Sequence, residues 1–143
     1  DNTFEPFEWE WWIEVAKLTR QDIQKLIEDT RVVMTDFEGV GLNLNCHDLS
    51  DLDLSGLALP FAALESANLD RVNLQGTDLE EADLRNASLV NANLQNASLK
   101  NAKVDGANFT GAKMKNADIR GASLKNTIIT QEQLRSARRY FWQ

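Results

Sequence analysis

The chain has 143 residues and a formal net charge of −7, from 22 acidic and 15 basic residues. This length indicates one domain with short appendages. A single histidine, His47, and a single cysteine, Cys46, exclude a histidine-rich metal site and an intramolecular disulfide. No apolar run reaches the length of about 18 residues that a transmembrane helix requires, so we expect no membrane span within the chain.

The charges are distributed unevenly along the sequence. Residues 1–84 contain 19 acidic and 5 basic residues, a net charge of −14, whereas residues 85–143 contain 3 acidic and 10 basic residues, a net charge of +7. An elongated fold of this sequence would therefore be an electric dipole. Such a field suits oriented docking or head-to-tail association, while a solvated surface without a partner is the alternative.

Residues 1–31 are predicted to form an N-terminal helical cap. Thr19, followed three residues later by Asp22, is typical of a helix N-terminus. The apolar face of this helix would contain Ile23, Leu26 and Ile27. An earlier short helix, at about residues 8–18, would carry Trp9 and Trp12 on its inner face.

A five-residue period follows. A large apolar residue occupies every fifth position from Leu44 to Ile129, which gives 18 consecutive centres, and two positions before each centre the residue is usually Ala. Neither a helix, with 3.6 residues per turn, nor a strand, with a period of two, fits this spacing. It fits short extended segments separated by turns, with four segments closing a coil of 20 residues. Asn or Gly usually stands two positions after a centre and tolerates positive φ there.

Residues 20 apart should then lie above one another. One outward-facing column alternates in charge, and we expect its members to pair across coils; it comprises Asn45, Glu65, Arg85, Asp105 and Lys125. His47 falls on an inward position of the first coil, where we expect a hydrogen-bonded core residue. Leu42, Leu52 and Leu57 occupy the other inward positions of this coil, so the N-terminal end should be wide and need a cover.

One coil departs from the polar pattern of its neighbours. Between positions 57 and 64, four apolar residues are predicted to face outward; they are Ala58, Pro60, Phe61 and Ala63. A contiguous exposed apolar patch usually marks a binding surface. The alternative is that the N-terminal segment folds back over the patch.

Residues 130–143 are predicted to form a C-terminal capping helix. Thr130 and Gln133 form a capping-box pattern, and the helix should extend to about Trp142. Its apolar stripe would contain Leu134, Ala137 and Phe141. The two ends of the chain also hold six closely spaced aromatic residues, which either plug the ends or form an interface; they are Trp9, Trp11, Trp12, Tyr140, Phe141 and Trp142.

The repeated unit resembles the A-(D/N)-L-x-x consensus of the pentapeptide-repeat family over about residues 42–129, as in Ala67-Asn68-Leu69, Ala82-Asp83-Leu84 and Ala92-Asn93-Leu94. The resemblance is to small cyanobacterial members with helical caps. It implies an all-β solenoid, a right-handed quadrilateral β-helix of about four to five coils without an inherent active site. The expected organisation is an N-terminal cap at 1–31, the β-helix at 32–129 and a C-terminal cap at 130–143.

We therefore expect a non-catalytic interaction or scaffold module without a cofactor, a metal or a catalytic residue. The sequence Asp51-x-Asp53 imitates the start of a calcium loop, but Ala62 stands where that loop needs a bidentate Glu. The expected partner is an unidentified protein, with a homodimer through an aromatic end as a second possibility. We expect neither direct nucleic-acid binding nor membrane insertion.

Two alternatives to the scaffold remain open. The resemblance implies a DNA mimic that binds a topoisomerase such as DNA gyrase, and the N-terminal aromatic residues suggest a membrane-proximal structural domain. No secretory signal is visible, but the chain begins at Asp1 without Met. The expected location is the bacterial cytoplasm or, if a leader has been removed, the periplasm or the thylakoid lumen.

Overall fold

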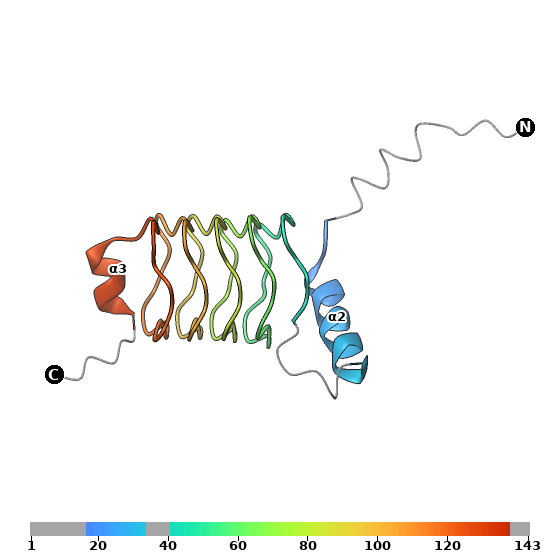
Figure 1. The fold of residues 1–143 in the computed structure, drawn as a ribbon. Coiled ribbons are helices and arrows are strands. Elements are labelled where there is room, and N and C mark those ends of the chain that lie inside the picture. The colour runs from blue at the N-terminus through green and yellow to red at the C-terminus, as the bar shows by residue number, and fades with distance from the viewer. Residues whose placement is uncertain (1–16, 34–40, 138–143) are drawn as a thin grey trace, which may run out of the picture.

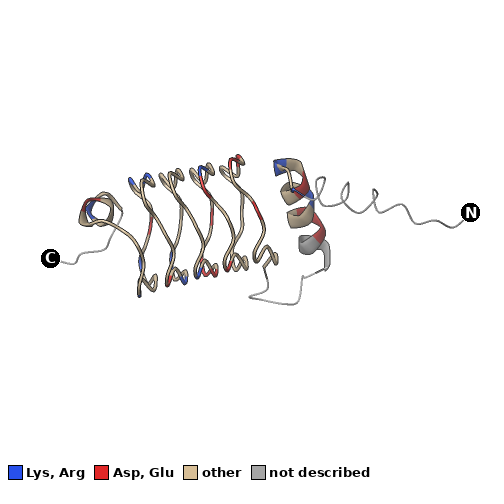
Figure 2. Ribbon diagram, turned by 90° about the horizontal axis from the view of Figure 1, so that it is seen from above, with Lys and Arg blue, Asp and Glu red and all other residues tan. Residues whose placement is uncertain are grey.

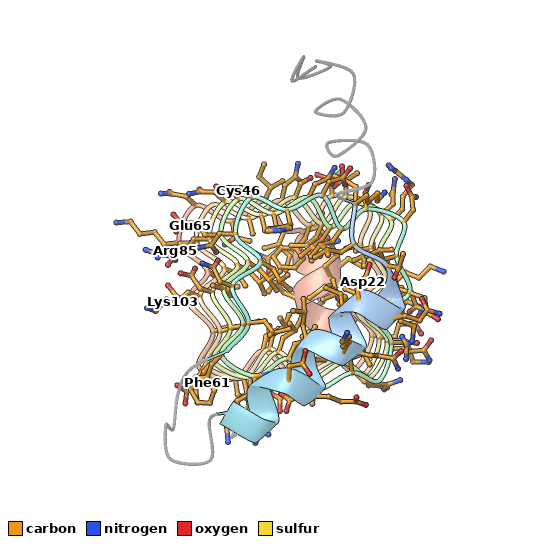
Figure 3. All side chains as sticks on the ribbon, turned by 90° about the vertical axis from the view of Figure 1, so that its right-hand side faces the viewer. Asp22, Cys46, Phe61, Glu65, Arg85 and Lys103 are labelled. Atoms are coloured by element: carbon orange, nitrogen blue, oxygen red, sulfur yellow. The ribbon has the colours of Figure 1, made fainter. Side chains whose placement is uncertain are left out.

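The computed structural model describes residues 17–33 and 41–137. Its centre is a solenoid of stacked coils, with helix α2 (Arg20–Val33) at the N-terminal end and helix α3 (Gln131–Ser136) at the C-terminal end (Figure 1). Seen along the solenoid axis, the coils have a four-sided outline and α2 crosses in front of the first coil (Figure 3). The all-β solenoid expected from the sequence is therefore present.

Parallel β-bridges fix the register of the coils. They run from Asn43↔Ala63 to Asn108↔Ile128, and each bridge joins residues 20 apart. The bridging residue always stands one position before an apolar centre. The predicted vertical stacking of residues 20 apart is therefore confirmed.

The backbone of each five-residue unit in the inner coils satisfies four of its five amides with main-chain carbonyls. In one unit, Leu69 and Arg71 donate to carbonyls of the next coil, at 2.7 and 2.8 Å. Val72 closes the turn by donating to the carbonyl of Leu69, at 3.2 Å. Asn73 donates to Leu52 of the preceding coil, at 2.9 Å. Because a buried backbone donor without a partner is costly, the fifth amide needs a side-chain acceptor.

The fifth amide belongs to the residue directly after the centre, and the side chain directly before the centre accepts its hydrogen bond. Asn68, for example, accepts from the amide of Asp70 at 3.0 Å. Ten units show this Asx turn, with Asn or Asp as the acceptor in each. The preference for Asp and Asn in the repeat is therefore a hydrogen-bonding requirement of the turn.

Several units without Asn or Asp at this position meet the requirement in other ways, whereas the described residues provide no acceptor for the amides of Lys100, Asp105 and Lys115. The amides of Glu65, Val90 and Lys125 are accepted by side chains 20 residues earlier, namely Asn45 at 2.8 Å, Asp70 at 3.0 Å and Asp105 at 2.9 Å. In the unit that has Ala58 before its centre, Pro60 follows the centre and has no amide proton to satisfy.

Every turn places one residue in the left-handed region. The residue two after the centre has a φ between 57° and 72° at all 17 turns from Cys46 to Asn126. Five of these residues are Gly and six are Asn, because these two residues reach this conformation at low cost. Phe61 and Glu81 adopt it as well, despite their bulkier side chains.

The core is a column of apolar centres with Ala between them. Leu49, Leu69, Leu89 and Phe109 lie above one another and are 1% exposed or less. Among the described residues, no buried polar side-chain atom lacks a hydrogen-bond partner. Thr77, which takes the place of Ala in one unit, donates to the carbonyl of Leu54 at 2.8 Å.

Helix α2 begins directly after Thr19, the predicted N-cap residue. Asp22 donates its amide to Oγ1 of Thr19 at 3.2 Å, and Thr19 donates its amide to the carboxylate of Asp22 at 2.8 Å. These hydrogen bonds from Thr19 lower the pKa of Asp22. Ile23 is fully buried against the core, as predicted, whereas Leu26 is 37% exposed.

Arg20 of α2 completes the open edge of the first coil. Its guanidinium donates to the carbonyls of Asp53 at 2.8 Å and Ser55 at 3.0 Å. One coil further on, the equivalent carbonyls of Asn73 and Gln75 accept backbone amides. Arg20 therefore supplies the two donors that a preceding coil would have supplied. The sequence gives no periodic signal for this contact.

His47 corrects the expectation of a core histidine, because its side chain is exposed. Its ring Nδ1 lies 3.0 Å from the carbonyl of Asn45. The inward position that His47 would fill holds Ala67 and Ala87 in the next two coils. The contacts of Lys17 and Arg20 hold α2 over residues 48–55, and α2 leaves His47 uncovered.

Helix α3 covers the last coil through Gln133. Its side-chain amide donates to the carbonyls of Phe109 at 2.6 Å and Ala112 at 2.9 Å, while Thr130 and Gln133 form the predicted capping box. The predicted extension to Trp142 is wrong. The helix ends at Ser136, whose carbonyl accepts the amide of Asn116 at 2.9 Å.

Replacing Ser98 with Asn should stabilise the solenoid. In the part of the chain that the structure describes, the amide of Lys100 receives neither kind of side-chain acceptor found in most other units. An Asn at position 98 would supply one, and a net hydrogen bond contributes about 0.5–1.5 kcal/mol. Thermal unfolding should show a higher Tm for Ser98→Asn.

The matched control is Ser88→Asn. Asp70 already accepts the amide of Val90 and also accepts the hydroxyl of Ser88 at 2.5 Å. This variant adds no acceptor that the turn lacks, so its Tm should not rise. An equal rise in both variants would contradict the account, because it would mean that Asn stabilises the position for another reason.

Candidate interaction surface

The predicted apolar patch lies at the N-terminal end of one side of the solenoid. Ala58 and Phe61 are exposed, with Phe61 37% accessible, whereas Pro60 and Ala63 are half-buried. Ala63 lies beyond the corner, where its backbone bridges to both neighbouring coils. The surface available for contact is therefore centred on Phe61.

Phe61 is held in an unusual backbone conformation. Its φ is 60°, at a turn position that Asn or Gly occupies in most units, and it lies at a corner of the four-sided outline (Figure 3). A left-handed conformation costs about 1–2 kcal/mol for a residue with a Cβ. Gly41 lies directly beneath, since a Cβ there would be 2.3 Å from the carbonyl carbon of Phe61. Gly41 and Phe61 are 20 residues apart, and this spacing of one coil is the feature of the sequence that could have predicted their contact.

Acidic residues follow Phe61 on the same side of the solenoid. Asp78, Glu80 and Glu81 occupy the next coil, above Ala58, Pro60 and Phe61. Glu80 lies 3.9 Å from the ammonium of Lys100, one coil further on. Glu81 is exposed and, like Phe61, adopts the left-handed conformation, with a φ of 58°. The apolar patch is thus bordered by negative charge.

The charge separation seen in the sequence is visible along the solenoid. Acidic residues are concentrated in the coils nearest α2, and basic residues are concentrated towards α3 (Figure 2). The acidic half of the surface contains the patch around Phe61. The dipole expected of an elongated fold is therefore present in the described residues.

The alternating charged column forms only in part. Arg85 lies 3.6 Å from Glu65 as expected, but its shortest ion pair, at 2.7 Å, is with Asp83 of its own unit. Asp105 accepts the backbone amide of Lys125 and not its ammonium. The hydrogen-bonding requirement of the turns takes precedence over pairing between coils.

The bidentate contact with Arg85 lowers the pKa of Asp83. Arg71, which adopts the left-handed conformation, makes a similar contact. It donates to the carboxylate of Asp51 at 2.7 and 3.1 Å. This hydrogen-bonded pair lowers the pKa of Asp51. In contrast, the described residues contain no such contact for the side chains of Phe61 and Glu81.

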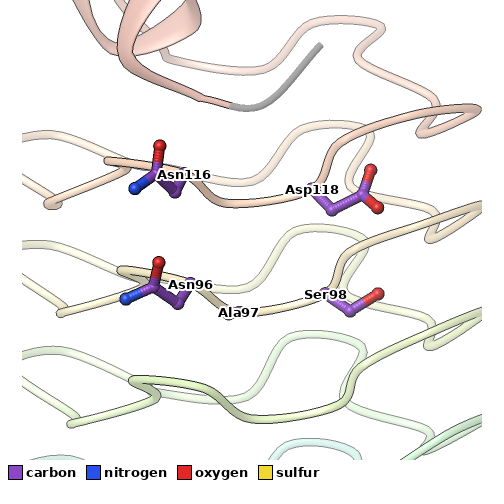
Figure 4. A pocket seen from close by; sticks show the side chains of 5 residues that line it. All are labelled: Asn96, Ala97, Ser98, Asn116 and Asp118. Carbon is purple, nitrogen blue, oxygen red and sulfur yellow. The ribbon is translucent and has the colours of Figure 1, made fainter. Parts of the chain in front are cut away.

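Two shallow depressions occur elsewhere on the described surface. One is lined by small, mostly polar residues of two successive coils, namely Asn96, Ala97, Ser98, Asn116 and Asp118 (Figure 4). Its carboxylate, that of Asp118, is already held by Arg120 at 2.6 Å. The other lies between the last coil and α3 and includes Lys113, Lys115 and Glu132. Neither depression brings together side chains that could act as an acid–base pair or bind a metal ion.

The described residues contain no group of three or more His, Cys, Asp or Glu side chains arranged to hold a metal ion. Within the same residues, no helix has both the length and the apolar character needed to cross a membrane. Six predicted contact residues, Trp9, Trp11, Trp12, Tyr140, Phe141 and Trp142, lie outside the described part of the chain.

The model of the pentapeptide repeats family matches the chain in 8 copies, over residues 48–86, 67–104 and 92–131. Together with the stacked 20-residue coils, this match shows that the chain belongs to the pentapeptide repeat family. Proteins of this family form right-handed β-helices and are generally non-enzymatic structural or interaction modules.

Several solved cyanobacterial structures are similar to the chain. The pentapeptide repeat protein alr5209 of Nostoc PCC 7120 is 32% identical with a TM-score of 0.56, covering 76% of this chain and 95% of its own. HetL of the same organism, a protein involved in the regulation of heterocyst differentiation, is 29% identical with a TM-score of 0.53, covering 60% and 48%. Rfr23 of Cyanothece 51142 is 36% identical with a TM-score of 0.49, covering 62% and 57%.

The chain thus spans only about half the length of Rfr23 and HetL. No curated protein sequence matches the chain.

The Asp83–Arg85 pair predicts a pH-dependent contribution to stability. The variant Asp83→Asn keeps a side-chain oxygen that can accept the amide of Arg85, but it removes the negative charge. Because the pKa of Asp83 is lowered by folding, the charged pair stabilises the wild type above the unfolded pKa of about 4. This stabilisation is lost as the pH falls through the lowered value.

Tm should therefore be higher for the wild type than for Asp83→Asn at pH 7, and the two values should converge at about pH 2–3. Asp105→Asn serves as the control, because the described residues hold no ion pair to its carboxylate. A difference between wild type and Asp83→Asn that is the same at both pH values would contradict the assigned role of the charge.

Proposed function

We propose that the chain is a non-catalytic protein-interaction module whose contact surface is centred on Phe61, with Ala58, Pro60 and Ala63 beside it. The observation that supports this most is the conformation of Phe61. An aromatic residue is kept exposed at a left-handed turn position where Asn or Gly would cost less. Membership of the pentapeptide repeat family is compatible with such a module.

The terminal helices are proposed to act as caps of a β-helical domain. An uncovered end of a solenoid exposes unpaired backbone groups that template aggregation. Arg20 and Gln133 each donate to two carbonyls at the ends of the described coils, which supports this role. The proposed organisation is a cap at 1–31, the solenoid at 32–129 and a second cap at 130–143.

The charge distribution favours the interaction module over a DNA mimic. A mimic of a polyanion needs negative charge along its whole length, whereas residues 85–143 carry a net charge of +7. The membrane-proximal alternative depends on aromatic residues that lie among residues 1–16, outside the described part of the chain.

The test compares protein capture by three forms of the immobilised chain, namely the wild type, Phe61→Asn and Cys46→Asn. Cys46 is the matched control, since it is exposed and adopts the same left-handed conformation at another corner. We expect at least one protein from an extract of the source organism to be retained by the wild type and Cys46→Asn, and lost from Phe61→Asn. Identical sets of retained proteins for all three forms would overturn the proposed surface.

A further inference from the structure

One side of the solenoid carries charges of both signs in two adjacent columns, and we call it the charged face. One column contains the outward residues directly before the apolar centres, and the other contains the outward residues directly after them. Figure 3 shows Glu65, Arg85 and Lys103 on this side of the four-sided outline. Six residues of four successive coils define the charged face, namely Glu65, Asp83, Arg85, Lys103, Asp105 and Lys125.

The signs alternate along both columns and across them. In the first column, a parallel bridge joins Asp83 to Lys103. The second column runs from negative to positive through Glu65, Arg85, Asp105 and Lys125. Within one coil, Asp83 stands beside Arg85 and Lys103 stands beside Asp105. The charged face is therefore a neutral, chequered surface with three acidic and three basic residues.

The chain itself pairs only part of these charges. Arg85 lies 2.7 Å from Asp83 and 3.6 Å from Glu65. Lys103 and Lys125 are exposed, and neither forms an ion pair with another described residue. Asp105 accepts two hydrogen bonds through Oδ1, and its Oδ2 has no acceptor role among the described contacts. Two cations and one carboxylate oxygen thus stay available for a partner.

The segments outside the described residues do not match this face in charge. Residues 1–16 contain five acidic residues and no basic one, and residues 34–40 contain two acidic residues and no basic one. Residues 138–143 contain two basic residues and no acidic one. Each segment carries charge of one sign, whereas the charged face alternates in sign. A matching partner needs both signs, repeated at the coil spacing of about 4.8 Å.

We infer that this partner is the charged face of a second copy, in an antiparallel dimer. The two-fold axis would lie between the faces, perpendicular to the solenoid axis and midway between the coils of Asp83 and Lys103. It reverses the order of the coils and keeps the two columns aligned. Three pairs result, each repeated by the axis: Asp83 with the partner's Lys103, Arg85 with the partner's Asp105 and Glu65 with the partner's Lys125.

Other registers of the antiparallel arrangement bring like charges together. A shift by one coil in one direction places Arg85 opposite the partner's Arg85, and a shift in the other direction places Asp105 opposite the partner's Asp105. Like charges held opposite each other are unfavourable. The chequered pattern therefore selects one register.

A parallel arrangement matches fewer charges than the antiparallel one. A two-fold axis along the solenoid would pair opposite charges in the coils of Arg85 and Asp105, but it would leave Glu65 and Lys125 opposite uncharged residues. It would also place the acidic portions of both copies side by side. In the antiparallel dimer, residues 1–84, with net −14, lie against residues 85–143 of the partner, with net +7.

The dimer should be weak and sensitive to salt. The levels of Glu65 and Lys125 are three coil spacings apart, about 14 Å, so the interface is small and belongs to the weak class. We expect a dissociation constant of about 10 µM to 1 mM at low salt. Because the pairs lie near solvent, added salt should dissociate them. Both copies use the same surface, so the assembly closes as a dimer and does not grow into a filament. This dimer uses a surface other than the one centred on Phe61 and does not depend on the role proposed for that residue.

Sedimentation equilibrium of the full chain tests the dimer, at chain concentrations up to about 1 mM and with a reductant so that Cys46 cannot link two copies. We expect the average mass at low salt to rise with concentration from 16.1 kDa towards twice that value. At high salt it should stay at the monomer mass.

A charge exchange between Glu65 and Lys125 makes the test specific, because these residues are about 14 Å apart within one chain and meet only in the dimer. Glu65→Lys and Lys125→Glu each place like charges opposite each other at both ends of the interface. Each should raise the dissociation constant by about tenfold or more. The double variant Glu65→Lys/Lys125→Glu reverses both pairs and should restore the dissociation constant to within about threefold of the wild type.

Net charge and folding are controlled separately. The two single variants change the net charge from −7 to −5 and −9, respectively, so a general effect of net charge would not weaken the dimer in both. Lys113→Glu has the same net charge as Lys125→Glu and changes an exposed residue on the opposite side of the solenoid, so its dimer should persist. Thermal unfolding of each variant in dilute solution checks that the monomer is folded.

Three outcomes would overturn the inference. The first is a wild type that stays monomeric at low salt and at the highest concentration. The second is a dimer that Glu65→Lys and Lys125→Glu leave unchanged, because another surface would then form it. The third is a double variant that dimerises as poorly as the single variants, because Glu65 and Lys125 would then not face each other.

Discussion

One amide in every five has no backbone acceptor, and this constraint governs the choice of residues along the whole solenoid. The other four amides pair with carbonyls in the same turn or in adjacent coils. In most units the fifth, directly after the apolar centre, takes its acceptor from Asn or Asp before the centre, or from a side chain one coil earlier. The polar position of the repeat is thus determined by backbone chemistry as much as by contact with water.

The same logic explains how the ends of the solenoid are completed. A coil edge exposes carbonyls whose donors would belong to a further coil. Arg20 meets two of them with one guanidinium, and Gln133 meets two with one side-chain amide. Both residues belong to helices that also pack apolar side chains against the core, where Ile23 of α2 is fully buried and Leu134 of α3 is partly buried. Hydrogen bonding and apolar burial therefore act together at both ends.

The repeat made most of the fold predictable from the sequence. A strict period of five predicts the 20-residue register, the buried centres and the left-handed turns, because each depends only on residues within one unit or one coil. The failures lie where periodicity ends. His47 belongs to the first coil, which has no coil before it, and α3 ends at Ser136 because its carbonyl pairs with Asn116. Neither contact has a repeated partner that a pattern could reveal.

The candidate surface was predicted in part for the same reason. An apolar deviation from a polar pattern identified Ala58, Pro60 and Phe61, and the structure places Ala58 and Phe61 in solvent. The pattern gave no role to Glu81, because its proximity to Phe61 becomes meaningful only once both are seen to adopt the left-handed conformation at one corner. The support of Phe61 by Gly41 likewise depends on the close approach of two backbones.

The central claim is that Phe61 is kept at this corner at the expense of stability. Left-handed backbone is costly for a bulky residue, and Asn tolerates it better. The most direct measurement is the Tm of Phe61→Asn beside that of Asn101→Phe, which places Phe at the same corner two coils away. The account predicts a higher Tm for Phe61→Asn and a lower Tm for Asn101→Phe. A lower Tm for Phe61→Asn would contradict it, because Phe61 would then be a residue that stabilises the fold.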